Sequence, residues 1–112
     1  MAVACKRDGT GGDCEIAAFA KHHETLIPGC TIYIKYGAKE FPGTDLSVYD
    51  DSKKAGSVGE AKGHTHFSGL LKGDYYLYGV GYDSSISMEV RGGIHIKLKK
   101  KGETELDVPV TE

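Results

Sequence analysis

The stretch KGHTHFSGLLKGDYYLYGVGYD, residues 62–83, decides the fold of this 112-residue chain. Its two runs of ring-bearing and β-branched residues, 64–67 and 75–82, are separated by glycines and charged residues, which is typical of two short strands and a turn. Side chains alternate between the two faces of a strand, so we expect Tyr75 and Leu77 to face the core. The outer face then carries Tyr76, Tyr78 and Tyr82.

The remaining sequence repeats this pattern of short alternating runs and turns. Glycine makes up 16 of the 112 residues, about twice its usual ~7%, and we find no long helical period. About seven short strands, with turn signals about every 8 to 12 residues, favour an all-β fold, an antiparallel or mixed β-sandwich. The expected core residues are Ile16, Ala18, Ile32, Ile34, Phe67, Leu70, Tyr75, Leu77, Val90, Ile96, Leu106 and Val108.

The N-terminal residues differ from the rest. Small residues at positions 2–4 precede Cys5, as at the end of a bacterial lipoprotein signal, where the cysteine becomes lipidated. The charged, glycine-rich residues that follow are typical of a flexible tether. We therefore expect a lipid-anchored N-terminus and tether over 1–13 and a single domain over 14–112. The alternative is a frayed N-terminus with an incidental cysteine.

One motif supports a resemblance to a known family. The pattern G-x-x-x-F-x-x-L-x-x-G-x-Y-x-L is carried by Gly63, Phe67, Leu70, Gly73, Tyr75 and Leu77, and residues 27–32 (IPGCTI) are similar to an L-P-G-A-x-V entry to the second strand. The chain thus resembles the carboxypeptidase-regulatory-like domains, which have a transthyretin-like (prealbumin-like) β-sandwich. The resemblance implies that fold and says little about function, because such domains serve many hosts.

The outward tyrosines form a candidate ligand-binding strip. Tyr33 lies on the strand expected over 30–36, which neighbours 75–82 in the resembled fold, so it joins Tyr76, Tyr78 and Tyr82. Aromatic rings stack on carbohydrate faces and anchor peptides. The alternative is that residues 37–60 fold over the strip, with Phe41 and Tyr49 as a small satellite core.

His64 and His66 form a candidate metal-binding pair. Two positions apart on one strand, their imidazoles share a face, and this spacing can chelate a metal ion. His22 or His23, in a predicted turn, would be a third ligand if the fold brought it near. The alternative is histidines on solvated strand edges, since the sequence holds neither H-E-x-x-H nor C-x-x-C.

The sequence contains no recognisable catalytic constellation. No G-x-S-x-G context surrounds a serine, and hydroxyisourate hydrolases of the resembled family end in YRGS, whereas this chain ends in VPVTE. We therefore expect no enzyme activity and no cofactor. Cys14 and Cys30 stand at opposite ends of consecutive predicted strands, beyond the ~7 Å reach of a disulfide, so we expect two buried thiols.

The charge balance, 14 basic against 16 acidic residues for a net charge of −2, argues against a nucleic-acid partner. The sequence favours a non-catalytic interaction or scaffold domain of the bacterial cell envelope, in the periplasm or on the outer-membrane surface. Its membrane contact would be the lipid on Cys5 alone, and its partner an envelope protein or a glycan. The alternatives are carbohydrate or peptide binding by the tyrosine strip and metal binding by His64 and His66.

Overall fold

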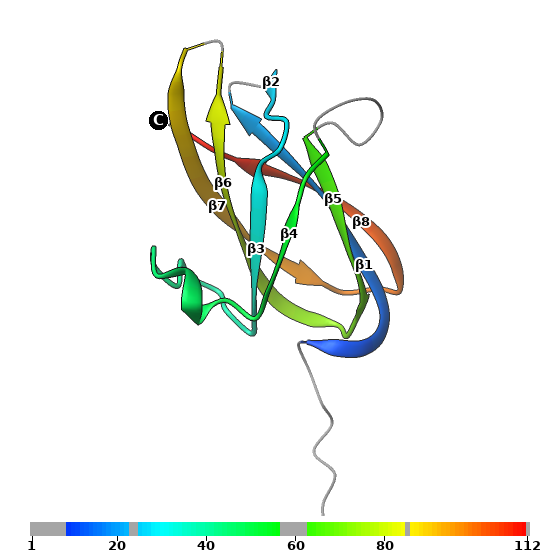
Figure 1. The fold of residues 1–112 in the computed structure, drawn as a ribbon. Coiled ribbons are helices and arrows are strands. Elements are labelled where there is room, and N and C mark those ends of the chain that lie inside the picture. Colours follow the sequence, from blue (N-terminus) through cyan, green and yellow to red (C-terminus); the bar gives the residue numbers. More distant parts are fainter. Residues whose placement is uncertain (1–8, 23–24, 57–62, 85, 112) are drawn as a thin grey trace, which may run out of the picture.

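A computed structural model, which describes residues 9–22, 25–56, 63–84 and 86–111, shows a β-sandwich (Figure 1). The predicted all-β sandwich is confirmed, with eight strands in the described residues where about seven were expected. No helix in these ranges is long and apolar enough to cross a membrane. The elements are β1 (Thr10–His22), β2 (Thr25–Leu26), β3 (Thr31–Tyr36), the 3-10 turn η1 (Leu46–Val48), β4 (Asp51–Lys54), β5 (His64–Leu70), β6 (Gly73–Asp83), β7 (Met88–Leu98) and β8 (Gly102–Pro109).

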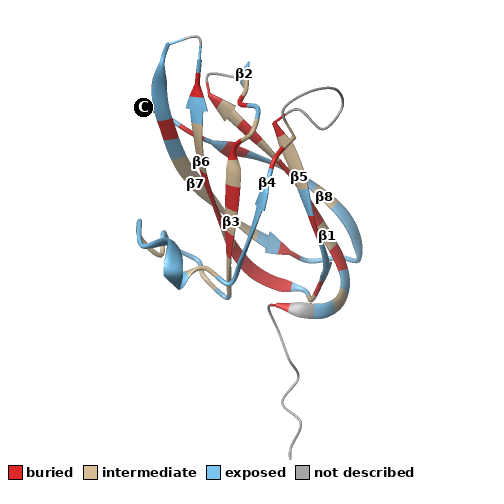
Figure 2. Ribbon diagram, in the orientation of Figure 1, coloured by how far each residue is buried: buried red, intermediate tan, exposed pale blue. Residues whose placement is uncertain are grey.

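The strand β1 is the centre of the first sheet, which we call sheet A. Along one side it pairs antiparallel with β5 and, near its end, with β2. Along the other side it pairs in parallel with β8, from Cys14 opposite Gly102 to Lys21 opposite Pro109. The second sheet, sheet B, has the antiparallel order β4-β3-β6-β7. Most of the buried residues, including the hydrophobic core, lie where the two sheets face each other (Figure 2).

The core follows the alternation expected from the sequence. Tyr75 and Leu77 of β6 are fully buried, as predicted. Ten of the twelve expected core residues are buried. The other two, Ile96 and Leu106, are only partly buried against the core, because β7 and β8 are edge strands of their sheets and lack a neighbour on one side.

Two boundaries differ from the expected ones. The strand β1 begins at Thr10, not at residue 14, so residues 10–13, which we expected to be part of a tether, belong to a strand. Thr10 and Cys14 both lie opposite Leu70, so the first residues of β1 form a bulge. A Cβ on Gly12 would lie 2.3 Å from the Leu70 carbonyl oxygen, so this close passage requires glycine. The predicted lipidation site, Cys5, lies outside the described residues and stays a prediction.

The polar segment 51–54, which we expected to be loop, is the edge strand β4. All four of its side chains are exposed, because an edge strand needs only backbone hydrogen bonds to one neighbour, and its charges discourage pairing with another chain. Residues 46–48 form η1, where the Asp45 side chain accepts a hydrogen bond from the Ser47 N–H. The predicted strand at 57–60 lies outside the described residues.

Gly92 of β7 lets the chain after β8 pass close to the β7 backbone. Gly92 and Gly93 lie within a continuous strand, β7. A Cβ on Gly92 would lie 2.3 Å from the Pro109 carbonyl oxygen. The chain after β8 therefore crosses β7 closely, and Arg91 and Thr111 exchange backbone hydrogen bonds of 2.8 and 2.9 Å. These bonds join the end of a sheet A strand to sheet B.

The two cysteines of the described residues are buried free thiols, as predicted. Burial raises the pKa of the Cys30 thiol to about 11, although a hydrogen bond with the Val80 backbone acts in the opposite direction. A thiol that remains protonated is a weak nucleophile. Cys30 therefore acts as a small apolar residue, packed beside Gly79 and Gly81.

The Tyr75 hydroxyl joins the start of β1 to β6. It accepts a hydrogen bond of 2.8 Å from the Gly9 N–H. Its own proton points to either of two carbonyl oxygens, that of Gly9 at 3.1 Å or that of Leu71 at 2.5 Å. A fully buried phenol thereby satisfies backbone groups where the chain enters the sandwich.

We predict that Tyr75→Phe destabilises the fold and loosens its N-terminal entry. The variant keeps the ring but leaves the Gly9 N–H without this acceptor, which costs ~1–3 kcal/mol of unfolding free energy. Denaturant unfolding measures the loss, and hydrogen exchange at residues 9–12 reports the loosening. Tyr82→Phe, at a ring that is 55% exposed, is the matched control and stays within ~0.5 kcal/mol. Equal stability of the two variants would contradict the role of the buried hydroxyl.

Candidate metal-binding site

The outer face of sheet A gathers histidine and glutamate side chains from three strands. Because Ile16 of β1 faces the core, its neighbours Glu15 and Ala17 face outward. The parallel register places Glu103 of β8 beside Glu15. The antiparallel register places His66 of β5 beside Ala17. The small Ala17 leaves room above β1 for these longer side chains to meet.

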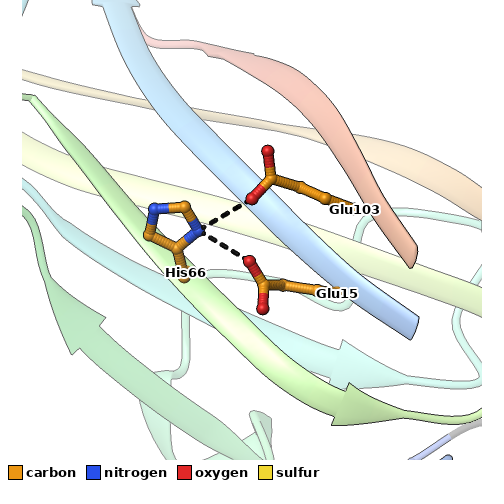
Figure 3. Close-up of side chains that lie close together, drawn as sticks. All are labelled: Glu15, His66 and Glu103. Carbon is orange, nitrogen blue, oxygen red and sulfur yellow. Dashed lines mark hydrogen bonds and ion pairs between the residues drawn. The ribbon is translucent and has the colours of Figure 1, made fainter. Parts of the chain in front are cut away.

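Glu15, His66 and Glu103 point toward one another (Figure 3). The Nδ1 atom of His66 lies 3.0 Å from Oε2 of Glu15 and 3.5 Å from Oε2 of Glu103. One donor atom from each residue lies within 4.8 Å of the other two. The His66 and Glu103 side chains are each 45% exposed, so the cluster is open to solvent and to ions.

The two carboxylates of this cluster oppose each other electrostatically. The pKa of Glu103 is raised above its usual value, first by a hydrogen bond with the Glu15 carboxyl, then by partial burial and the negative charge of Glu15. His66 acts in the opposite direction. A bound cation would relieve the repulsion between the two carboxylates.

His64 contacts His66 from the other side. The Nε2 atoms of the two rings lie 2.8 Å apart. The His64 ring also stacks on Phe19, with 4.7 Å between ring centroids and 12° between planes, which fixes its orientation. The predicted pair of histidines is therefore brought together, with its Nε2 atoms facing each other, while Nδ1 of His66 faces the glutamates.

Of the two histidines suggested as a third ligand, the prediction of His22 is wrong. His22 lies on the opposite face of β1, where its Nδ1 atom is 2.9 Å from Oδ2 of Asp83 in a buried contact. His23 lies outside the described residues.

Glu15 and Glu103 were missed, because each was read as one charged residue in an alternating strand. The signal that would have found them is the pairing of β1 with both β5 and β8.

The predicted tyrosine strip lies on the outer face of sheet B, but the chain covers its centre. Tyr78 is buried although it points outward. Tyr49 stacks on it at 5.7 Å between centroids, and Phe41 lies 5.3 Å from it and 5.9 Å from Tyr76. Tyr33 lies 5.8 Å from the Tyr49 ring. Tyr82 alone of the four predicted residues is mostly exposed.

A scan against protein-family models finds none that matches this chain. A search of the curated proteins finds no matching sequence.

The covering of the strip predicts a change of stability at alkaline pH. Burial raises the pKa of Tyr49 from 10.0 to about 12, and charge on Tyr78 and Tyr76 adds to the shift. Between about pH 10 and 12 the folded state therefore keeps a proton that the unfolded state loses, so the unfolding free energy falls as the pH rises. Tyr49→Phe should make this fall shallower. Denaturant unfolding at several alkaline pH values, with pH 8 as each protein's own reference, measures both slopes; parallel slopes would show that Tyr49 is not shielded.

Proposed function

We propose that this chain is a non-catalytic binding domain that holds a divalent transition-metal ion on the outer face of sheet A. The observation that carries the proposal is the convergence of Glu15, His66 and Glu103 from three strands, with donor atoms within 4.8 Å of one another. Imidazole and carboxylate together suit Zn²⁺ and similar ions.

The spacing of the donors fits a shared ion. Ligands that bind zinc at about 2.0–2.2 Å, at angles between a right angle and the tetrahedral angle, stand about 2.8–3.6 Å apart. The separations of 3.0 and 3.5 Å from His66 Nδ1 to the two glutamates are close to this. An ion would take the place of the proton on Nδ1, so its binding releases a proton and weakens as the pH falls.

We assign His64 the role of orienting His66 and not of binding the ion. A metal on Nδ1 leaves the proton of His66 on Nε2, from which it is donated across 2.8 Å to Nε2 of His64. Metal-bound histidines commonly donate their second N–H in this way. Since Phe19 stacks on His64, the His64 ring is fixed in the position from which it orients His66.

Three protein ligands leave a further position on the ion. Zinc with three protein donors takes a water molecule or an outside donor as its fourth ligand. On an exposed sheet face that donor can come from a partner protein, so metal binding and the expected interaction role are compatible. The tyrosine strip is the weaker candidate, because Phe41 and Tyr49 cover its centre.

We infer a carboxypeptidase-regulatory-like, transthyretin-like domain of the bacterial envelope as the setting of this function. The motif supports the family proposal, since its apolar positions are buried and its two glycines have positive φ, 70° at Gly63 and 147° at Gly73. The envelope location rests on the sequence around Cys5.

We predict saturable Zn²⁺ binding to untagged, chelator-treated protein, with one ion per chain. His66→Ala removes it, because it deletes the central donor, and Glu15→Gln and Glu103→Gln each weaken it. His64→Gln lowers the affinity by about 10–100-fold, as loss of an orienting partner does. Calorimetry measures affinity, and the rise in melting temperature gives a second readout, since a hundredfold excess over Kd adds ~2.7 kcal/mol of stability.

The control for these variants is His95→Ala. His95 also pairs with a carboxylate, Asp74 at 2.9 Å, but on sheet B. The His95→Ala variant should bind Zn²⁺ with the affinity of the wild type. Unchanged affinity in His66→Ala, or equal loss in His95→Ala, would refute the site.

A further inference from the structure

A pocket lies at the end of the sandwich where β1 and β6 begin and β7 ends. This pocket, of ≈ 720 Å³, opens between the two sheets. Its volume falls within the range of small-molecule sites, about 300–1,000 Å³. The residues that line it are separate from the histidine and glutamate cluster.

The pocket is strongly cationic for a chain whose net charge is −2. Four lysines line it, against one carboxylate, that of Asp13. Asp13 lies 3.7 Å from the Lys101 ammonium group, and both side chains are 74% exposed, so this ion pair is weak and easily exchanged. The lysines are Lys72, Lys97, Lys99 and Lys101.

Beside the lysines, the pocket has an apolar side and a side made of backbone. Leu71 and the buried Leu98 form its apolar side. The bulge of β1 forms another side, where Gly12 passes the Leu70 carbonyl too closely for any side chain. Gly11, with φ of 108°, has a backbone conformation that favours glycine. Because these glycines carry no side chains, a ligand can approach the backbone at this wall.

We propose that this pocket binds a phosphate group carried on a small organic body. The lysine ammonium groups would hold the phosphate as point charges. The organic part would contact Leu71 and Leu98, which a free ion cannot use. The ligand is therefore a phosphate monoester or diester of small size, and the proposal is independent of the metal site.

Two sources share this chemistry, a soluble phosphate ester and the headgroup of an anionic phospholipid. Cys5 precedes Gly9, the first described residue, by four residues, which span at most about 14 Å of chain. A lipid on Cys5 would hold the start of β1, and with it this end of the sandwich, near a membrane surface. The experiment distinguishes the two sources.

The test uses the chelator-treated chain without a lipid on Cys5. Glycerol 3-phosphate is the soluble probe. Vesicles of phosphatidylglycerol or of phosphatidylcholine are the membrane probes. Lys97→Gln/Lys99→Gln is compared with Lys53→Gln/Lys54→Gln, which removes equal charge from β3's exposed neighbour β4. NMR titration measures soluble binding and sedimentation measures vesicle binding. We expect the pocket variant to weaken binding about tenfold or more and the β4 variant to have little effect.

Saturable binding of glycerol 3-phosphate without vesicle binding supports a soluble ester as the ligand. Binding to phosphatidylglycerol vesicles that only the pocket variant abolishes supports the headgroup. Equal weakening by both double variants shows attraction by general charge and overturns the proposal. Absence of binding to both probes overturns it as well.

Discussion

The alternation of side chains along β1 is the constraint on which the rest of the structure depends. Ile16, Ala18 and Ala20 are fully buried against sheet B, so Glu15 and Phe19 must face outward. A slip of one residue would bring a carboxylate into the core and expose three apolar side chains. The register that protects the core is therefore the same register that sets Glu15 beside Glu103 and Ala17 opposite His66. A change in the register of β1 would therefore alter both the stability of the core and the arrangement of the metal-donor side chains.

The sequence predicted the fold well and the site in part, for physical reasons that differ. Alternation is local, so the inward direction of Tyr75 and Leu77 follows from a few neighbouring residues. The same rule placed His64 and His66 on one face. It could not reveal Glu15, which is 51 residues from His66 along the chain, because their contact depends on long-range register and on the bulge around Leu70. The edge strand β4 was missed since its exposed polar residues lack any alternation.

The two outer faces of the sandwich are used differently. Sheet B is covered in part by its own chain, with Phe41 and Tyr49 packed over Tyr78. This covering removes an aromatic surface that would otherwise promote association. Sheet A has small and charged side chains at the corresponding place, and the small Ala17 leaves space above the centre of β1. The face that carries the donor atoms is thus the one on which the chain places no loop among the residues that the structure describes.

The parallel pairing of β1 with β8 also has a mechanical consequence. Strand β1 enters at one end of the sandwich and β8 leaves at the other, with their ladder running from Cys14 opposite Gly102 to Lys21 opposite Pro109. A pull on the two ends of the domain is therefore directed along these strands. It loads the hydrogen bonds of the ladder together, in shear, instead of opening them one after another. A domain built this way resists stretching along the direction of β1 and β8.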